Sequence, residues 1–111
     1  MSTVGMNEMS YSVLRDTTTV ETRPLSGDPV LHRVWIVCIR GAFYHLSWLS
    51  RSYDRDLPEC KAYPCNETGE IRIWRVLSCC YCVNPNVAFA EVMEDLLATE
   101  VVKEVDEACV D

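Results

Sequence analysis

The chain has 111 residues, of which 49% are hydrophobic and 24% charged, and these proportions indicate a globular protein rather than a disordered segment. This length fits a single small domain, 1–111, that buries about two-thirds of its unfolded surface and needs neither a metal nor a disulfide to fold. The chain starts without a basic and apolar signal segment and contains no run of 18 apolar residues. We therefore expect no contact with a membrane and a cytoplasmic or intracellular, reducing location.

The net charge of −7 is confined to the last quarter of the chain. Residues 1–83 contain nine acidic and nine basic residues, whereas residues 84–111 contain eight acidic residues and one base, Lys103. A negative pole of this kind repels nucleic acid and attracts basic surfaces. The charge therefore argues against direct binding of nucleic acid.

The first half of the chain predicts strands. Residues 1–9 are expected to form a loose arm, and residues 11–22, rich in threonine and valine, an edge strand. Residues 30–39 are nearly all apolar or β-branched and give the strongest strand signal.

A tight hairpin is predicted after this strand, with Gly41 and Ala42 as its turn. This register pairs Cys38 with His45 and Trp35 with Trp48. It also places one apolar set on a single face of the sheet, which is the predicted core: Leu31, Trp35, Val37, Ile39, Tyr44, Leu46 and Trp48.

The second half predicts a long loop, a strand and a helix. Residues 50–70 contain prolines, a glycine and mixed charges, and are expected to form a loop that is functional or pinned internally. Residues 71–83 are expected to form another strand. Asn84 and Pro85 predict a helix start, and the residues after them an apolar stripe that runs on as one helix or breaks near residues 98–100.

These elements predict an α+β fold. We expect an antiparallel sheet of three or four strands, with one C-terminal helix, continuous or broken, packed on one face.

Four of the 7 cysteines could hold a structural zinc ion. Zinc takes four thiolate or imidazole ligands, and a pair in the loop together with a pair on the following strand could supply them. These candidate metal ligands are Cys60, Cys65, Cys80 and Cys82. Their spacing lacks the C-x2-C pairs of zinc ribbons, and the alternative is that cysteine serves as a small buried residue.

Catalytic motifs are scarce. Cys38 opposite His45 could form a thiolate nucleophile, but the sequence assigns no third residue to orient the histidine. Phosphate-binding glycine motifs are also missing from the sequence. We therefore expect no enzymatic activity and no catalytic residues, and no cofactor unless the zinc site forms.

The acidic helix is the strongest functional signal. We expect a small, non-catalytic inhibitor, of the kind that viruses and phages encode against host defence proteins, that blocks a basic, nucleic-acid-binding surface of a partner protein. The candidate partner-binding residues are Glu91, Glu94, Asp95, Glu100, Glu104, Asp106 and Glu107 on the helix, with Arg51, Tyr53 and Arg55 in the loop. A zinc-stabilised adaptor and a Cys38/His45 enzyme are the alternatives.

Overall fold

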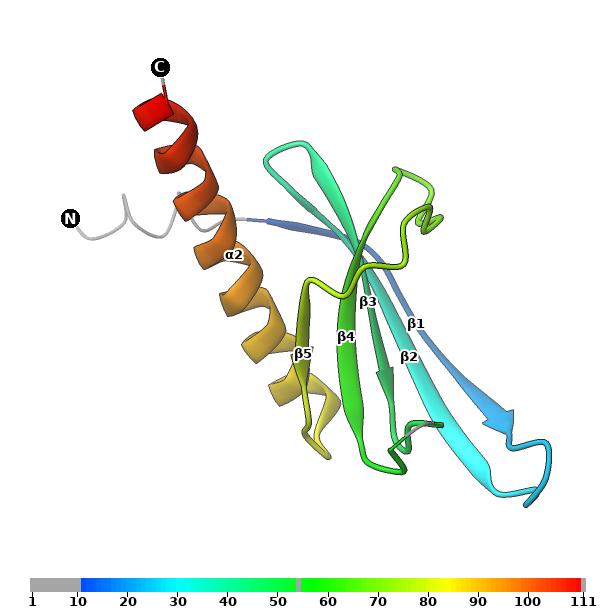
Figure 1. The fold of residues 1–111 in the computed structure, drawn as a ribbon. Helices are drawn as coiled ribbons and strands as arrows, with labels where there is room; N and C mark the ends of the chain where they lie inside the picture. Colours follow the sequence, from blue (N-terminus) through cyan, green and yellow to red (C-terminus); the bar gives the residue numbers. More distant parts are fainter. Residues whose placement is uncertain (1–10, 54, 111) are drawn as a thin grey trace.

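The computed structural model describes residues 11–53 and 55–110, and the side chains of the C-terminal helix as far as Thr99. Five consecutive strands form one antiparallel sheet in chain order: β1 (Ser12–Thr22), β2 (Pro29–Ile39), β3 (Ala42–Leu49), β4 (Glu59–Cys65) and β5 (Ser78–Cys80). In this part of the chain a single helix, α2 (Pro85–Val110), follows the sheet and packs on one face (Figure 1). The predicted α+β class is confirmed, with five strands instead of three or four.

The hairpin of β2 and β3 is confirmed, but its turn lies one residue earlier than predicted. Arg40 and Gly41 form the turn, with φ of 52° and 83°, and Ile39 pairs with Ala42. Two positive φ values are typical of the type I′ turn, whose twist matches that of the flanking strands. The earlier turn moves every cross-strand partner by two positions, which leaves each side chain on its predicted face.

The predicted core face is therefore confirmed for six of its seven residues, and only Leu31 is exposed. The buried ones are Trp35, Val37, Ile39, Tyr44, Leu46 and Trp48. They pack against the apolar stripe of α2, formed by Ala88, Val92, Met93, Leu96 and Leu97. Burying one leucine-sized side chain contributes about 1.5–3 kcal/mol, so this face holds the helix on the sheet.

Two predictions between residues 50 and 83 are wrong. The expected loop contains β4, which pairs with β3 along its whole length. Pro64 and the mixed charges are typical of a loop, so the sequence alone did not indicate this strand. On its other side β4 pairs with β5 only at Cys60–Ala62, so Pro64 interrupts no ladder bond there. The expected strand 71–83 is reduced to the three residues of β5, because residues 71–76 pair with no strand and leave Trp74 72% exposed.

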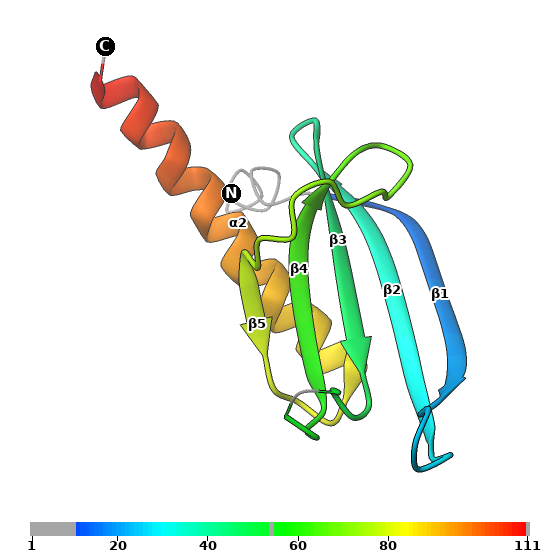
Figure 2. The same ribbon diagram turned by 45° about the vertical axis from the view of Figure 1, so that its right-hand side comes forward.

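The helix begins as predicted. The side-chain Oδ1 of Asn84 accepts hydrogen bonds from the backbone N–H groups of Asn86 (2.9 Å) and Val87 (3.4 Å), as an N-cap residue does. The helix then continues through residues 98–100, so the alternative of a broken helix is wrong. Its later turns extend past the edge of the sheet (Figures 1 and 2). Among the described residues, no helix combines the length and the apolar character needed to cross a bilayer.

The face of the sheet opposite α2, called the open face below, is covered only at its two ends. At one end the turn 66–70 lies over Ile36, which is 2% exposed, and a Cβ atom added at Gly69 would stand 2.8 Å from the Ile36 Cδ1. At the other end Arg23 of the β1–β2 turn donates a hydrogen bond to the carbonyl of Ser52 (3.1 Å) and fixes the loop 50–57. Polar side chains lie between the two covers.

Candidate functional site

The outer side of α2 carries an exposed group of carboxylates, called the acidic face below. Glu91, Glu94 and Asp95 are exposed and stand at positions i, i+3 and i+4, so they lie on one side of the helix. The sequence from residue 85 to residue 102 contains no basic residue that could offset them. Like charges at this spacing destabilise a helix by about 0.2–0.5 kcal/mol per pair. The acidic face therefore weakens the helix that carries it.

A shallow hollow of about 360 Å³ adjoins the acidic face. It is lined by Asn86, Val87, Ala90, Glu91 and Glu94, and Val87 is 46% exposed. The hollow thus combines an apolar floor with two carboxylates. Such a surface suits the aliphatic stem and charged head of an arginine or lysine side chain. The other four predicted acidic residues, Glu100, Glu104, Asp106 and Glu107, lie outside the described side chains.

The loop half of the predicted binding surface is engaged within the molecule. Arg51 forms ion pairs with Asp56 and Asp28. Arg51, and then Arg23, lower the pKa of Asp56 to about 2. The loop is therefore pinned by its own charges.

The other two predicted loop residues also have contacts within the molecule. The Tyr53 hydroxyl donates a hydrogen bond to Glu21 (3.0 Å), and the Arg55 guanidinium stands 5.8 Å from the centre of the Tyr81 ring. Among the described side chains of the predicted surface, those of Glu94 and Asp95 on α2 make no hydrogen bond or ion pair, and that of Glu91 accepts a hydrogen bond from the Cys80 thiol (2.6 Å).

The four candidate zinc ligands are only partly brought together. Cys60 and Cys80 are cross-strand partners, and Cys80 and Cys82 both pack against the helix-side core. Cys65 lies five positions after Cys60 on β4, so its side chain faces the other side of the sheet. In the described residues, no three His, Cys, Asp or Glu side chains form a group that could hold a metal ion. The four-cysteine zinc site stays a prediction.

The thiols of Cys60 and Cys80 are held in their protonated form. Burial raises the pKa of both to about 12, and for Cys80 the hydrogen bond to Glu91 adds to this effect. A thiol of this kind is a poor nucleophile at neutral pH.

The predicted pairing of Cys38 with His45 is wrong, because the earlier hairpin turn changes the register. Cys38 pairs with Phe43, and His45 pairs with Ile36. Nδ1 of His45 donates a hydrogen bond to the carbonyl of Gly69 (3.2 Å), and burial lowers the pKa of this histidine. His45 thus holds the turn 66–70 against the sheet instead of activating a thiol.

The open face contains a chain of three polar side chains that the sequence analysis missed. His32 lies between Glu21 and Ser47, with 2.7 Å from its Nδ1 to Glu21 Oε2 and 2.7 Å from its Nε2 to Ser47 Oγ. The three residues come from β1, β2 and β3. They are joined because the ladders place Thr19 opposite His32 and Val34 opposite Ser47, so Glu21 and Ser47 are both diagonal neighbours of His32.

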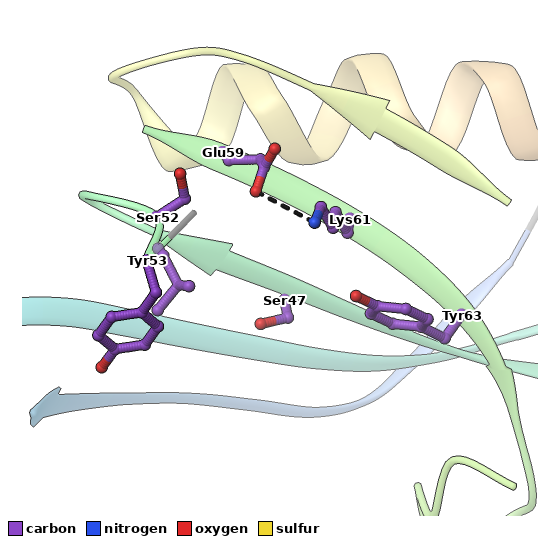
Figure 3. A pocket seen from close by; sticks show the side chains of 7 residues that line it. Ser47, Ser52, Tyr53, Glu59, Lys61 and Tyr63 are labelled. Atoms are coloured by element: carbon purple, nitrogen blue, oxygen red, sulfur yellow. Dashed lines mark ion pairs between the residues drawn. The ribbon is translucent and has the colours of Figure 1, made fainter. Parts of the chain in front are cut away.

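Ser47 also borders a hollow of about 170 Å³, called the polar hollow below. Figure 3 shows its side chains on β3, β4 and the loop 50–57, with α2 on the far side of the sheet. The lining residues are Ser47, Leu49, Ser52, Tyr53, Glu59, Lys61 and Tyr63. Lys61 lies opposite Ser47 in the ladder, and its Nζ stands 3.4 Å from Glu59 Oε1.

The sequence held one signal for this chain of side chains, which is the parity of the strands. His32 and Ser47 lie on the same face of the sheet in both the predicted and the observed register. The predicted register, however, pairs His32 with Arg51 and Ser47 with Ile36. A hairpin turn placed one residue earlier would have made them diagonal neighbours.

Comparison with protein-family models, with curated proteins and with solved structures found no match for this chain.

Proposed function

We propose that this protein is an inhibitor that binds a partner protein through the acidic face of α2 and blocks a basic surface that otherwise holds nucleic acid. The observation that carries the proposal is the hollow beside the exposed carboxylates Glu91 and Glu94. The side chain of a partner arginine or lysine would lay its stem on Val87 and Ala90 and set its charge between these two carboxylates.

The repulsion within the acidic face supports the proposal. Glu91, Glu94 and Asp95 weaken the free helix, and a basic partner surface would remove that cost on binding. The same charges would speed the encounter and make it sensitive to salt, as a nucleic-acid mimic requires. We expect the encounter in a reducing intracellular compartment, and the free thiols of the six described cysteines support this.

The test measures binding of the protein to an immobilised peptide of ten arginines. The sample contains no double-stranded DNA, because DNA would compete for the peptide. Glu94→Lys should weaken binding at least about tenfold, because it removes one side of the hollow and reverses its charge. Glu67→Lys is the matched control, because Glu67 is also an exposed acid and the change in net charge is identical.

The two variants separate a specific surface from a general charge effect. Equal weakening by both would mean that only the net charge attracts the peptide, and it would overturn the proposal. Unchanged binding by Glu94→Lys would overturn it as well. In the wild-type protein, raising the salt concentration should weaken binding steeply.

A further inference from the structure

We propose that Ser47 is a nucleophile that accepts acyl groups from small carboxylic esters, with His32 as its general base and Glu21 as the positioning residue. This activity belongs to the open face. It is independent of the acidic face of α2, which lies on the other side of the sheet (Figure 2).

The hydrogen bonds fix which nitrogen of His32 carries the proton. The hydrogen bond from His32 lowers the pKa of Glu21, so this carboxyl group is an ionised acceptor. In the neutral imidazole of His32, Nδ1 must then be the donor, which leaves the lone pair on Nε2 to accept the hydroxyl proton of Ser47. This is the arrangement of a serine that is ready to give its proton to a histidine.

The chain of side chains rests on a rigid support. Glu21, His32 and Ser47 stand on three neighbouring strands, which hold side chains more accurately than loops do. The second carboxylate oxygen of Glu21 accepts a hydrogen bond from the Tyr53 hydroxyl, so the carboxylate is held from two directions.

The polar hollow gives an ester access to Ser47. Its volume of about 170 Å³ suits a small acyl group, and Leu49 and Tyr63 provide apolar surface for the rest of the substrate. Lys61 is the cation among the described lining residues. Lys61 lies directly opposite Ser47 in the ladder, and its ammonium group stands 3.4 Å from Glu59 Oε1. To stabilise the oxyanion that forms beside Ser47, this ammonium group would have to turn from Glu59 toward the serine.

The reaction is a hydrolysis in two balanced steps. The Ser47 oxygen bonds to the ester carbonyl carbon while its proton passes to Nε2 of His32, and the ester C–O bond then breaks as the leaving alcohol takes that proton. Water next attacks the acyl-serine, gives its proton to His32 and releases the carboxylic acid, as Ser47 recovers its proton.

The experiment treats the full chain with p-nitrophenyl acetate and, separately, with a fluorophosphonate probe, and then maps the modified residue by peptide mass spectrometry. We expect the label on Ser47 and no label there in Ser47→Ala. His32→Gln and Glu21→Gln should slow the labelling about 100-fold or more, because each removes the base or its orientation. Ser26→Ala, which changes an exposed serine in the β1–β2 turn, should leave the rate unchanged.

A pH profile separates a positioning role of Glu21 from a merely structural one. The labelling rate of the wild-type protein should rise with pH, because the attack of the serine needs a general base in its unprotonated form. Glu21→Gln should displace or flatten this rise even if its melting temperature equals that of the wild type. The other charged or titratable groups near His32 are Tyr53 in the loop, His45 on β3, and Glu59, Lys61 and Tyr63 on β4.

Two results would overturn the inference. One is a label that falls on Lys61 or on several surface serines instead of Ser47. The other is labelling of Ser47 at the same rate in His32→Gln variants that melt like the wild type. Glu94→Lys should label normally, so the outcome of this test does not depend on the inhibitor proposal.

Discussion

The two faces of the sheet are stabilised in different ways. The face under α2 is a continuous apolar core, in which residues such as Leu46 and Val92 are fully buried. The open face is closed only at its ends by loops that are held with hydrogen bonds and ion pairs, and between them it keeps polar side chains within reach of solvent. The face under α2 therefore supplies most of the stability, which leaves the middle of the open face free to carry polar groups.

The largest expected effect tests the apolar face of the sheet under α2. Leu46→Ala removes a side chain with no exposed surface and should lower the free energy of unfolding by about 2–5 kcal/mol. Val20→Ala, at a β1 position that is 65% exposed, is the control and should change it by about 0.5 kcal/mol or less. Chemical denaturation measures both. A cost for Leu46→Ala as small as that for Val20→Ala would contradict the assignment of the core.

A second substitution tests the turn 66–70, which covers one end of the open face. In Gly69→Ala the new Cβ would stand 2.8 Å from the Ile36 side chain at a residue with φ of +92°, and we expect a loss of roughly 2–4 kcal/mol from crowding and backbone strain together. Gly27→Ala is the matched control, since Gly27 has φ of +75° but open space around it, and it should cost about 1 kcal/mol. Equal losses of unfolding free energy in the two variants would show that the turn 66–70 is not closely packed against the sheet.

The smallest effect is a dependence of stability on pH that belongs to the open face. Burial lowers the pKa of His45 below 6.5. The contribution of neutral His45 to the stability is therefore complete above pH 6.5 and is lost as the pH falls. Arg51 and Arg23 lower the pKa of Asp56 from 3.8 to about 2, so the ion pairs of the loop persist above pH 3.8 and disappear as the pH falls toward 2. Acidification should therefore first weaken the turn 66–70, which His45 holds, and then the loop 50–57, which the ion pairs of Asp56 hold.

The melting temperature as a function of pH checks this order. His45→Gln should remove the step that lies below pH 6.5 and keep the lower one, while Asp56→Asn should do the reverse. A single step that both variants leave in place would assign the acid sensitivity to other groups.

Features whose signal repeats along the chain could be predicted from the sequence. Alternation in residues 30–49 identified the face that carries Trp35 and Trp48, and Asn84 with Pro85 marked the helix start. A period of two survives an error of one residue in the turn, because such an error moves partners by two positions.

Features that depend on the pairing of two strands could not be predicted from the sequence. The strand β4 contains Pro64 and alternating charges, and it becomes a strand because β3 offers it a partner along its whole length. The grouping of Glu21, His32 and Ser47 likewise depends on two strand registers at once. Neither register can be read from a residue pattern in one segment.

The strand order has a consequence for how fast the protein folds. Each strand pairs with the one that precedes it in the chain, and a turn of only two residues joins β2 to β3. Closing this two-residue loop costs little entropy, whereas the connections from β3 to β4 and from β4 to β5 are longer. We expect the β2–β3 hairpin to form first and α2 to dock last, because the helix packs on a face to which β2, β3 and β4 all contribute. The apolar face of the sheet therefore stays uncovered until the helix has been synthesised.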